Sequence, residues 1–195
     1  MFDRAGVRTV VVVEGVSDRE ALDALAGRRG IDLAAEGIRI VPIGGAHGIG
    51  PFLRDLAPRE HAFKLAGLFD AGEERVVRDA LERAGHGRQL TRERMERLGF
   101  FVCVADLEDE LIRSHGPAGV EDVLDAQGDL GHFRMFQQQP AQRGRTRDAQ
   151  LRRFLGTRSG RKAQYARLLV DALDLSRVPG PLDRVLAHAT EGVGS

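Results

Sequence analysis

The feature that most constrains the fold is the segment Val7 to Val13, a β-branched run that ends in four consecutive valines. A strand that is apolar on both faces is typical of the interior of a parallel sheet. Comparable strand signals recur at Ile38 to Ile43, Lys64 to Phe69 and Phe100 to Ala105, with helix signals between them. Strands separated by single helices imply right-handed crossovers. The sequence therefore predicts an α/β fold with a mostly parallel, doubly wound sheet flanked by helices.

Helix signals divide the chain into two parts. Ser17 and Glu20 have the spacing of a capping box, which would open a helix through about Arg29. Further helices are expected at Phe52 to Leu56, Glu73 to Ala84, after Asp106, at Val120 to Ala126, at Ala149 to Leu155 and at Lys162 to Leu173, with a loop from Gln137 to Arg147. We expect a catalytic domain over residues 1–116 and a helical, arginine-rich extension over residues 117–195 that packs on it.

The composition excludes several classes of protein. A chain of 195 residues can form one α/β domain with a modest extension, and it contains no apolar stretch long enough to span a membrane. Met1 to Arg8 lacks the layout of a signal peptide. The single cysteine, Cys103, lies in an apolar segment and is expected to be a buried hydrophobic residue. These features predict a cytoplasmic protein.

Charge is segregated along the chain although the formal net charge is zero. Between Asp70 and Asp129 there are fifteen acidic and eight basic residues, whereas between Arg134 and Arg167 there are ten basic residues and one acid. An acidic centre followed by a basic arm fits a metal site beside a polyanion track. The same distribution fits a solvated helix face rich in arginine, so charge alone leaves both interpretations open.

Acidic residues follow three of the four predicted strands. They are Glu14 and Asp18 after the first strand, Asp70, Glu73 and Glu74 after the third, and Asp106, Glu108, Asp109 and Glu110 after the fourth. Ligands of parallel α/β sheets bind at the carboxyl ends of the strands. Carboxylates gathered there repel one another unless a cation offsets their charge, and hard oxygen ligands suit Mg²⁺ or Mn²⁺.

Local structure offers an alternative role for several of these acids. Asp18 could stabilise a helix N-terminus as readily as bind a ligand, and Glu73 and Glu74 could do the same for the next helix. Asp106 and Asp109 have the spacing of a helix cap and its return partner. Neither capping nor packing explains Glu14, Asp70 or Glu108, so these three are the strongest candidates for metal ligands.

The order of these motifs resembles the Toprim domain, and in particular its version in the OLD family of nucleases. Glu14-Gly15 with Asp18 resembles the first Toprim motif, and Leu68 to Gly72 the second. The segments Asp106 to Leu111 and Ser159 to Ala166 resemble the OLD-type version. The resemblance implies a Toprim-like, Rossmann-like fold and a role for Lys162 in stabilising the transition state.

Two departures from the family pattern matter. Gly72 stands where many relatives have the second aspartate of an Asp-x-Asp motif, so one ligand is missing or is supplied by Glu73, Glu74 or Glu108. OLD proteins usually carry an ATPase domain ahead of Toprim, and Gly156 to Lys162 lacks the spacing of a Walker A loop. An ATPase would then be a separate partner or absent. The turn from Gly44 to Gly50 matches no dinucleotide fingerprint.

Lysine is rare in this chain, which has only Lys64 and Lys162. With Ser159 as the expected helix N-cap, Lys162 would lie in a first turn, where the helix dipole disfavours a cation. Such a lysine suggests a compact ammonium near a phosphate, although an exposed lysine whose stem packs on its helix would look the same.

The combined expectation is an enzyme that hydrolyses DNA phosphodiester bonds with Mg²⁺ or Mn²⁺, an endonuclease of the hydrolase class. The expected catalytic residues are Glu14, Asp70 and Lys162, and the expected metal ligands are Glu14, Asp18, Asp70, Glu73 and Glu108. DNA-binding residues would be Arg143, Arg145, Arg147, Arg152, Arg153, Arg158 and Arg161, which would contact the backbone without reading sequence. Two alternatives remain: nucleotidyl transfer, as in Toprim primases, and a non-catalytic subunit that binds metal or nucleic acid, which Gly72 favours. A homo-oligomer is compatible with all three.

Overall fold

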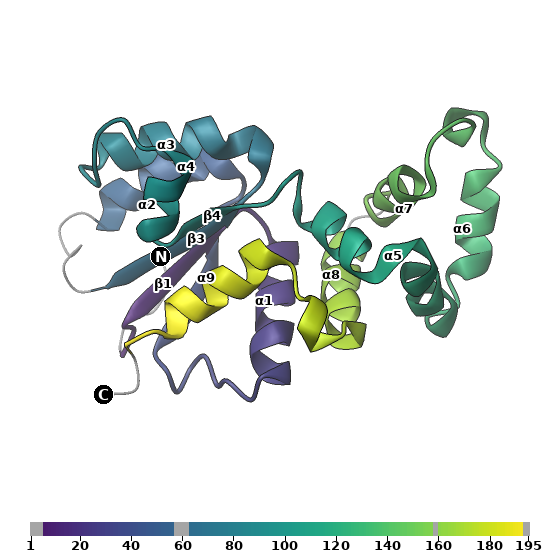
Figure 1. The fold of residues 1–195 in the computed structure, drawn as a ribbon, viewed down its shortest axis with the longest axis horizontal. Coiled ribbons are helices and arrows are strands. Elements are labelled where there is room, and N and C mark those ends of the chain that lie inside the picture. Colours follow the sequence, from purple (N-terminus) through teal and green to yellow (C-terminus); the bar gives the residue numbers. More distant parts are fainter. Residues whose placement is uncertain (1–5, 57–62, 158–159, 193–195) are drawn as a thin grey trace.

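The computed structural model describes residues 6–56, 63–157 and 160–192 (Figure 1). Its strands are β1 (Thr9–Val13), β2 (Ile38–Pro42), β3 (Lys64–Phe69) and β4 (Phe100–Val102). Its α-helices are α1 (Val16–Arg28), α2 (Ile49–Leu56), α3 (Glu74–Arg83), α4 (Arg92–Arg97), α5 (Leu107–Ala126), α6 (Leu130–Gln137), α7 (Arg147–Leu155), α8 (Arg161–Ala172) and α9 (Gly180–Thr190). In this part of the chain, no helix is both long and apolar enough to cross a membrane.

The four strands form one parallel sheet in the order β2-β1-β3-β4. This confirms the α/β class and the mostly parallel sheet. Val13 is in register with Pro42 on one side and with Leu68 on the other, so the carboxyl ends of β1, β2 and β3 meet at one edge. The sheet therefore brings the segments after β1 and β3 side by side.

The valines of β1 are buried because helices cover both faces of the sheet. Val11 and Val13 pack with residues of α1, α5 and α9, while Val10 and Val12 pack with residues of α2, α3 and α4. Alternate residues of a strand point to opposite faces, so each face has its own hydrophobic cluster. Cys103 is buried in the first cluster, as expected for a small hydrophobic residue.

Helices α5 to α8 extend from the carboxyl end of the sheet (Figure 1). Helix α5 is bent at Gly116, whose φ of 70° is left-handed and which is followed by Pro117. Helix α8 packs against α1, and α9 returns to lie on β3 and β4. The last helix thus covers the sheet itself. The division of the chain near residue 116 stays a prediction.

Several local predictions need correction. Helix α1 is capped by Gly15 and Asp18, since the Gly15 N–H donates to Asp18 Oδ2 at 2.7 Å, so the expected Ser17–Glu20 capping box was wrong. The expected loop from Gln137 to Arg147 begins with the last residue of α6 and includes a 3₁₀ turn at Pro140–Gln142. Helices α4, α6 and α9 were not expected. The predicted N-cap Ser159 lies outside the described residues.

Candidate metal and phosphodiester site

Glu14 lies immediately after β1 and is directed toward the neighbouring strand. Its Oε1 accepts a hydrogen bond from the backbone N–H of Asp70 at 2.8 Å. Because β1 and β3 are adjacent and parallel, this bond joins the ends of the two strands. The structure therefore brings Glu14 and Asp70 together.

Asp18 reaches the same edge of the sheet from the first turn of α1. Its side chain is buried, and the hydrogen bond from the Gly15 N–H occupies Oδ2. Capping and ligand binding were alternatives for this residue at the sequence level. The capping contact uses one carboxylate oxygen, and the other remains available for a second role.

Glu108 and Lys162 come from helices α5 and α8 and form a direct ion pair. Lys162 Nζ lies 3.0 Å from Glu108 Oε2. Glu108 is only 4% exposed, and its Oε1 has no hydrogen-bond partner in the described parts of the chain. Burying an unpaired carboxylate oxygen is unfavourable, so this atom is a specific candidate for a cation ligand.

The carboxylates at this edge perturb one another. Burial, followed by repulsion from Glu14 and Asp18, raises the pKa of Asp70 to about 7. Burial and repulsion from Glu108 raise the pKa of Asp18 to about 6. The pKa values of Glu14 and Glu108 are also raised, mainly by burial. These groups interact because the fold brings them close together, and a bound cation would relieve their repulsion.

Lys162 is the cation that faces this group. Its own burial disfavours the ammonium, but the carboxylates of Glu108, Asp18 and Asp70 outweigh that effect and raise its pKa. The ammonium in turn offsets part of the rise in the pKa values of Glu14 and Asp18. Lys162 therefore lies in the first turn of α8, as predicted, and pairs there with Glu108.

The remaining acids have different surroundings. Glu73 is close enough to raise the pKa of Glu14. Glu74 forms ion pairs with Arg78 and Arg92, which makes it a poor substitute for a ligand at position 72. Gly72 is exposed, and a Cβ atom there would have no atom within 4 Å, so the glycine is not required by packing.

Asp106 has a second role that the sequence did not indicate. Its Oδ1 caps α5 by accepting the Asp109 N–H at 2.8 Å, as predicted. Its Oδ2 accepts a hydrogen bond from Arg152 Nε at 2.7 Å. Asp106 also contributes to the raised pKa of Asp70. This residue links the tip of β4 to α7 at the border of the acidic group.

The carboxylates at this edge are the kind of ligand that a divalent cation prefers. Their side chains are not already arranged to coordinate one ion. Glu14, Asp18 and Glu108 each hold one oxygen in a protein contact and have a second oxygen. Across residues 6–56, 63–157 and 160–192, no group of three or more Asp, Glu, His or Cys side chains is arranged to ligate one metal ion. The fixed oxygens orient the carboxylates, and side-chain movement would be needed to bring the second oxygens onto one ion.

The arginines expected to bind DNA fall into two groups. Arg147, Arg152 and Arg161 form ion pairs with Glu121, Asp106 and Asp129, respectively. Arg143, Arg145 and Arg153 are exposed, and Arg145 also donates to the Ala141 carbonyl. Arg158 lies outside the described residues.

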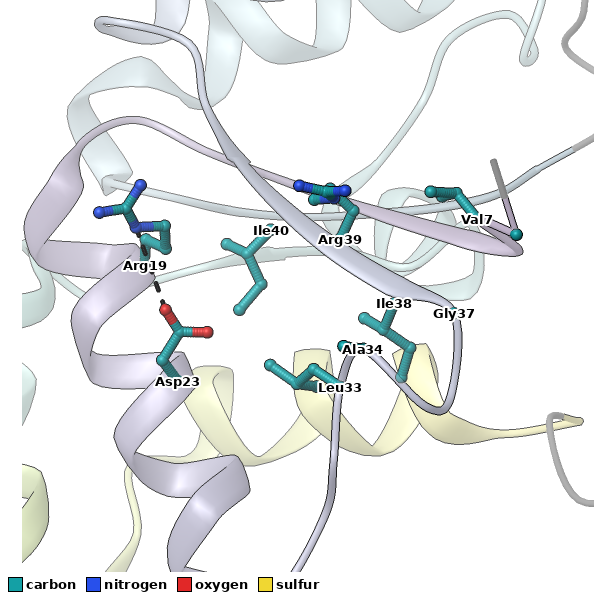
Figure 2. Close-up of a pocket in the computed structure, with 10 residues that line it drawn as sticks. Val7, Arg19, Asp23, Leu33, Ala34, Gly37, Ile38, Arg39 and Ile40 are labelled. Atoms are coloured by element: carbon teal, nitrogen blue, oxygen red, sulfur yellow. Dashed lines mark ion pairs between the residues drawn. The ribbon is translucent and has the colours of Figure 1, made fainter. Parts of the chain in front are cut away.

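A separate cavity of about 540 Å³ lies between α1 and the edge strand β2 (Figure 2). Figure 2 shows the ion pair between Arg19 and Asp23 at its border, with Ile38 and Ile40 of β2 beside it. None of the residues that sequence analysis selected lines this cavity. The candidate chemistry is therefore at the carboxyl edge of the sheet and not in this hollow.

Comparison with known proteins identifies a family that resembles the first part of the chain. Residues 7–70, about a third of the chain, match the family described as "Overcoming lysogenization defect protein-like, TOPRIM domain". This matched segment includes Glu14, Asp18 and Asp70. The search of curated proteins found no match.

Solved structures extend the similarity to almost the whole chain. The C-terminal region of the OLD protein from Xanthomonas campestris pv. campestris is 22% identical, with a TM-score of 0.74, over 96% of this chain and 94% of that one. The C-terminal region of the Burkholderia pseudomallei OLD protein is 21% identical, with a TM-score of 0.70, over 96% of this chain and 98% of that one. Residues 7–70 therefore match the OLD-like TOPRIM family, within a chain that has the Toprim-like α/β fold of OLD C-terminal regions.

Proposed function

We propose that this protein is a nuclease that hydrolyses phosphodiester bonds of DNA with the help of Mg²⁺ or Mn²⁺. The observation that carries the proposal is a pair of contacts at one edge of the sheet: Glu14 accepts the Asp70 N–H, and Lys162 pairs with the buried Glu108. Asp18 and these acids also perturb one another's pKa values. Raised pKa values in a group of carboxylates from separate elements are typical of functional sites. The OLD-like TOPRIM match supports a phosphodiester substrate.

Glu14, Asp18, Asp70 and Glu108 would hold the cation, with Glu73 as a further ligand from the segment after β3. When bound, a divalent ion would supply charge to offset a phosphate and to lower the pKa of a coordinated water. The backbone N–H groups of Gly15 and Asp70 orient the side chains of Asp18 and Glu14. In this proposal, Glu14 and Asp70 are catalytic residues that complete the charge distribution around the reacting phosphate.

Lys162 would contribute a positive charge beside the phosphate. Its ammonium is held by Glu108 and lies within the influence of Asp18 and Asp70. A cation positioned before the reaction stabilises developing negative charge without reorganisation of solvent. The exposed Arg143, Arg145 and Arg153 would bind the DNA backbone.

The test is incubation of the purified protein with supercoiled plasmid and Mg²⁺ or Mn²⁺, with parallel reactions in EDTA. Conversion to nicked or linear DNA only with the metal ion would support hydrolysis. A nucleotidyl transferase would instead lengthen a labelled primer when nucleoside triphosphates are present. Metal or DNA binding with neither reaction would favour a non-catalytic subunit, the alternative that Gly72 supports.

A further inference from the structure

A second cavity, of about 370 Å³, lies between α6 and the junction of α7 with α8. Its lining residues are His132, Met135, Phe136, Gln139, Phe154, Thr157 and Arg161. The cavity is separate from the carboxylate group, yet Arg161 directly precedes Lys162 in the chain. Arg161 is directed toward Asp129, whereas Lys162 is directed toward Glu108. The first turn of α8 therefore lies between the two features.

Aromatic rings form the inner wall of this cavity. Phe154 is buried and packs against Phe136, with a centroid separation of 5.5 Å and a 58° angle between the rings. The Arg161 guanidinium lies over the Phe154 ring, 4.4 Å from its centroid. Because both rings and the guanidinium are held by packing, the wall is already formed in the free protein.

Arg161 also places hydrogen-bond donors at the cavity. It is 7% exposed, with Nη1 3.1 Å from Thr157 Oγ1 and Nη2 3.4 Å from Asp129 Oδ1. Asp129 is held in turn by the Tyr165 hydroxyl at 2.8 Å. A guanidinium has five N–H donors, so these two contacts leave others that could meet the polar edge of a ligand.

The rim combines an exposed apolar side chain with polar ones. Met135 is 62% exposed, one of the few large hydrophobic residues with such exposure in the described ranges. His132 and Gln139 are exposed beside it. A flexible thioether next to an aromatic ring suits a flat, polarizable ligand better than a phosphate alone.

Most of the residues that line the cavity belong to a basic segment of the chain. The segment from Arg134 to Arg167 contains ten basic residues and one acid, and Arg143, Arg145 and Arg153 are exposed in it. Single-stranded nucleic acid binds to surfaces that combine positive charge with aromatic stacking positions. A base can enter such a cavity only when it is unpaired.

We infer that this cavity binds a nucleobase from a single-stranded segment of the DNA, through stacking at Phe136 and Met135 and polar contacts at Arg161 and Gln139. The inference rests on the proposed function and names the part of the substrate that the extension recognises. With a phosphate near Lys162, a nearby base of the same strand would lie on the other side of the α8 N-terminus. The extension would then favour DNA that is unpaired next to the cleaved bond.

The test compares two fluorescein-labelled ligands in EDTA by anisotropy: a short oligodeoxythymidine and an abasic strand with the same number of phosphates. Since stacking of one base changes affinity by about 5- to 150-fold, the wild-type protein should prefer the base-bearing strand by at least about fivefold. Phe136→Leu keeps an apolar side chain but removes the ring, and Met135→Ala changes an exposed residue. Both should reduce the preference.

Leu175→Ala is the matched control, because Leu175 is a large hydrophobic residue with 38% exposure that does not line this cavity. It should keep the wild-type preference, and thermal melts would verify the fold of each variant. Equal wild-type affinity for the two strands, or an undiminished preference in both cavity variants, would overturn the inference while leaving the proposed hydrolysis intact. Failure to bind either strand, together with no plasmid cleavage, would overturn both.

Discussion

Carboxylates have raised pKa values at the acidic edge of the sheet, whereas a buried carboxylate among the arginine-rich helices has a lowered one. At the edge, Asp70 and Asp18 are buried near other carboxylates and their pKa values rise to about 7 and about 6. In the helices, Glu121 accepts hydrogen bonds from Arg134 and Arg147, and its pKa is lowered, chiefly by the bonds from Arg147. Lys162 pairs with Glu108 beside Asp18 and Asp70, whereas Glu121 pairs with two arginines.

This difference separates carboxylates whose oxygens are all paired from carboxylates that keep an unpaired oxygen. Glu121 is 7% exposed in its side chain and joins α5 to α6 and α7 through its two partners. Glu108 is equally buried, but one of its oxygens has no hydrogen-bond partner within the described ranges. A high local density of charge is thus not sufficient evidence of function, because the pairing of each group decides its role.

The largest expected effect is at Glu14. Glu14→Gln keeps the shape of the side chain and its ability to accept the Asp70 N–H, but it removes the charge. Because loss of even an indirect metal contact costs about 10- to 100-fold, we expect plasmid cleavage to fall by more than about 100-fold. The melting temperature in EDTA should stay the same or rise, since repulsion within the group decreases.

Glu93→Gln is the matched control for this change, because Glu93 is exposed on α4. It should cleave plasmid at the wild-type rate. If Glu14→Gln cleaves plasmid as fast as wild type, Glu14 has no catalytic role. The carboxylates of the edge would then differ from Glu121 only in their pKa values.

A smaller effect, on stability, is expected at Glu121. Glu121→Gln would leave Arg134 and Arg147 without their carboxylate and would weaken the attachment of α6 and α7 to α5. The arginines are about half exposed and can regain water, so we expect a loss of about 1–3 kcal/mol in the free energy of unfolding. Urea denaturation would measure it.

The neighbouring Asp122 is exposed, so Asp122→Asn should leave the free energy of unfolding nearly unchanged. The pKa of Glu121 is lowered in the folded state, so its stabilising effect is present above its unfolded pKa and lost as the pH falls through the folded pKa. Equal stability of Glu121→Gln and wild type near neutral pH would contradict a structural role for this cluster.

The next prediction compares the exposed arginines with the paired ones in DNA binding. Replacing Arg143, Arg145 and Arg153 with alanine should weaken DNA binding and reduce the slope of log Kobs against log salt by up to about 2–3, because each phosphate that is no longer neutralised lowers the slope by about 0.9. Arg147→Ala and Arg152→Ala should change that slope less, because these two side chains already pair with Glu121 and Asp106. Anisotropy titrations at several salt concentrations would measure both sets.

The comparison to make is which set of arginines, exposed or paired, lowers the salt slope more. A larger loss of slope from the paired arginines than from the exposed ones would mean that DNA displaces the internal ion pairs. An unchanged slope in the triple variant would leave the exposed arginines as a solvated surface.

The smallest expected effect is the pH dependence that Asp70 imposes. Its folded pKa, about 7, lies above its unfolded value, so its contribution to stability is present at low pH and is lost as the pH rises through about 7. Because Asp70 is partly exposed, solvent screening reduces the effect to about 1 kcal/mol, and Asp70→Asn should raise the melting temperature in EDTA at pH 8 by about 2–4 °C.

Mg²⁺ should reverse part of the wild-type loss at pH 8 and should stabilise Asp70→Asn less. Wild-type cleavage should also increase as the pH rises through about 7, because the ionised carboxylate is the form that binds a cation. A melting temperature in EDTA that does not depend on Asp70 between pH 5 and 8 would contradict the repulsion at this edge.

The sequence alone predicted a mostly parallel sheet and the acids that follow its strands, although it did not predict the order of the strands. Strand β3 begins and ends at the predicted residues, and β1 contains the four valines because an apolar, β-branched run has a local preference for a buried strand. The positions of Glu14 and Asp70 at strand ends followed from the same periodicity. These properties depend on residues that are close in the chain, so the amino-acid sequence is enough to predict them.

The tertiary structure decided which charges are paired. Asp106 meets Arg152 from 46 positions away, and Glu121 meets Arg147 from 26 positions away. The sequence predicted Ser17 and Glu20 as the cap of α1, whereas the structure has Gly15 and Asp18. Several polar side chains in that segment could cap a helix, so local sequence could not decide between them. Sequence determines the chemical type of each side chain, but the burial and the partner that set its pKa depend on how distant helices pack.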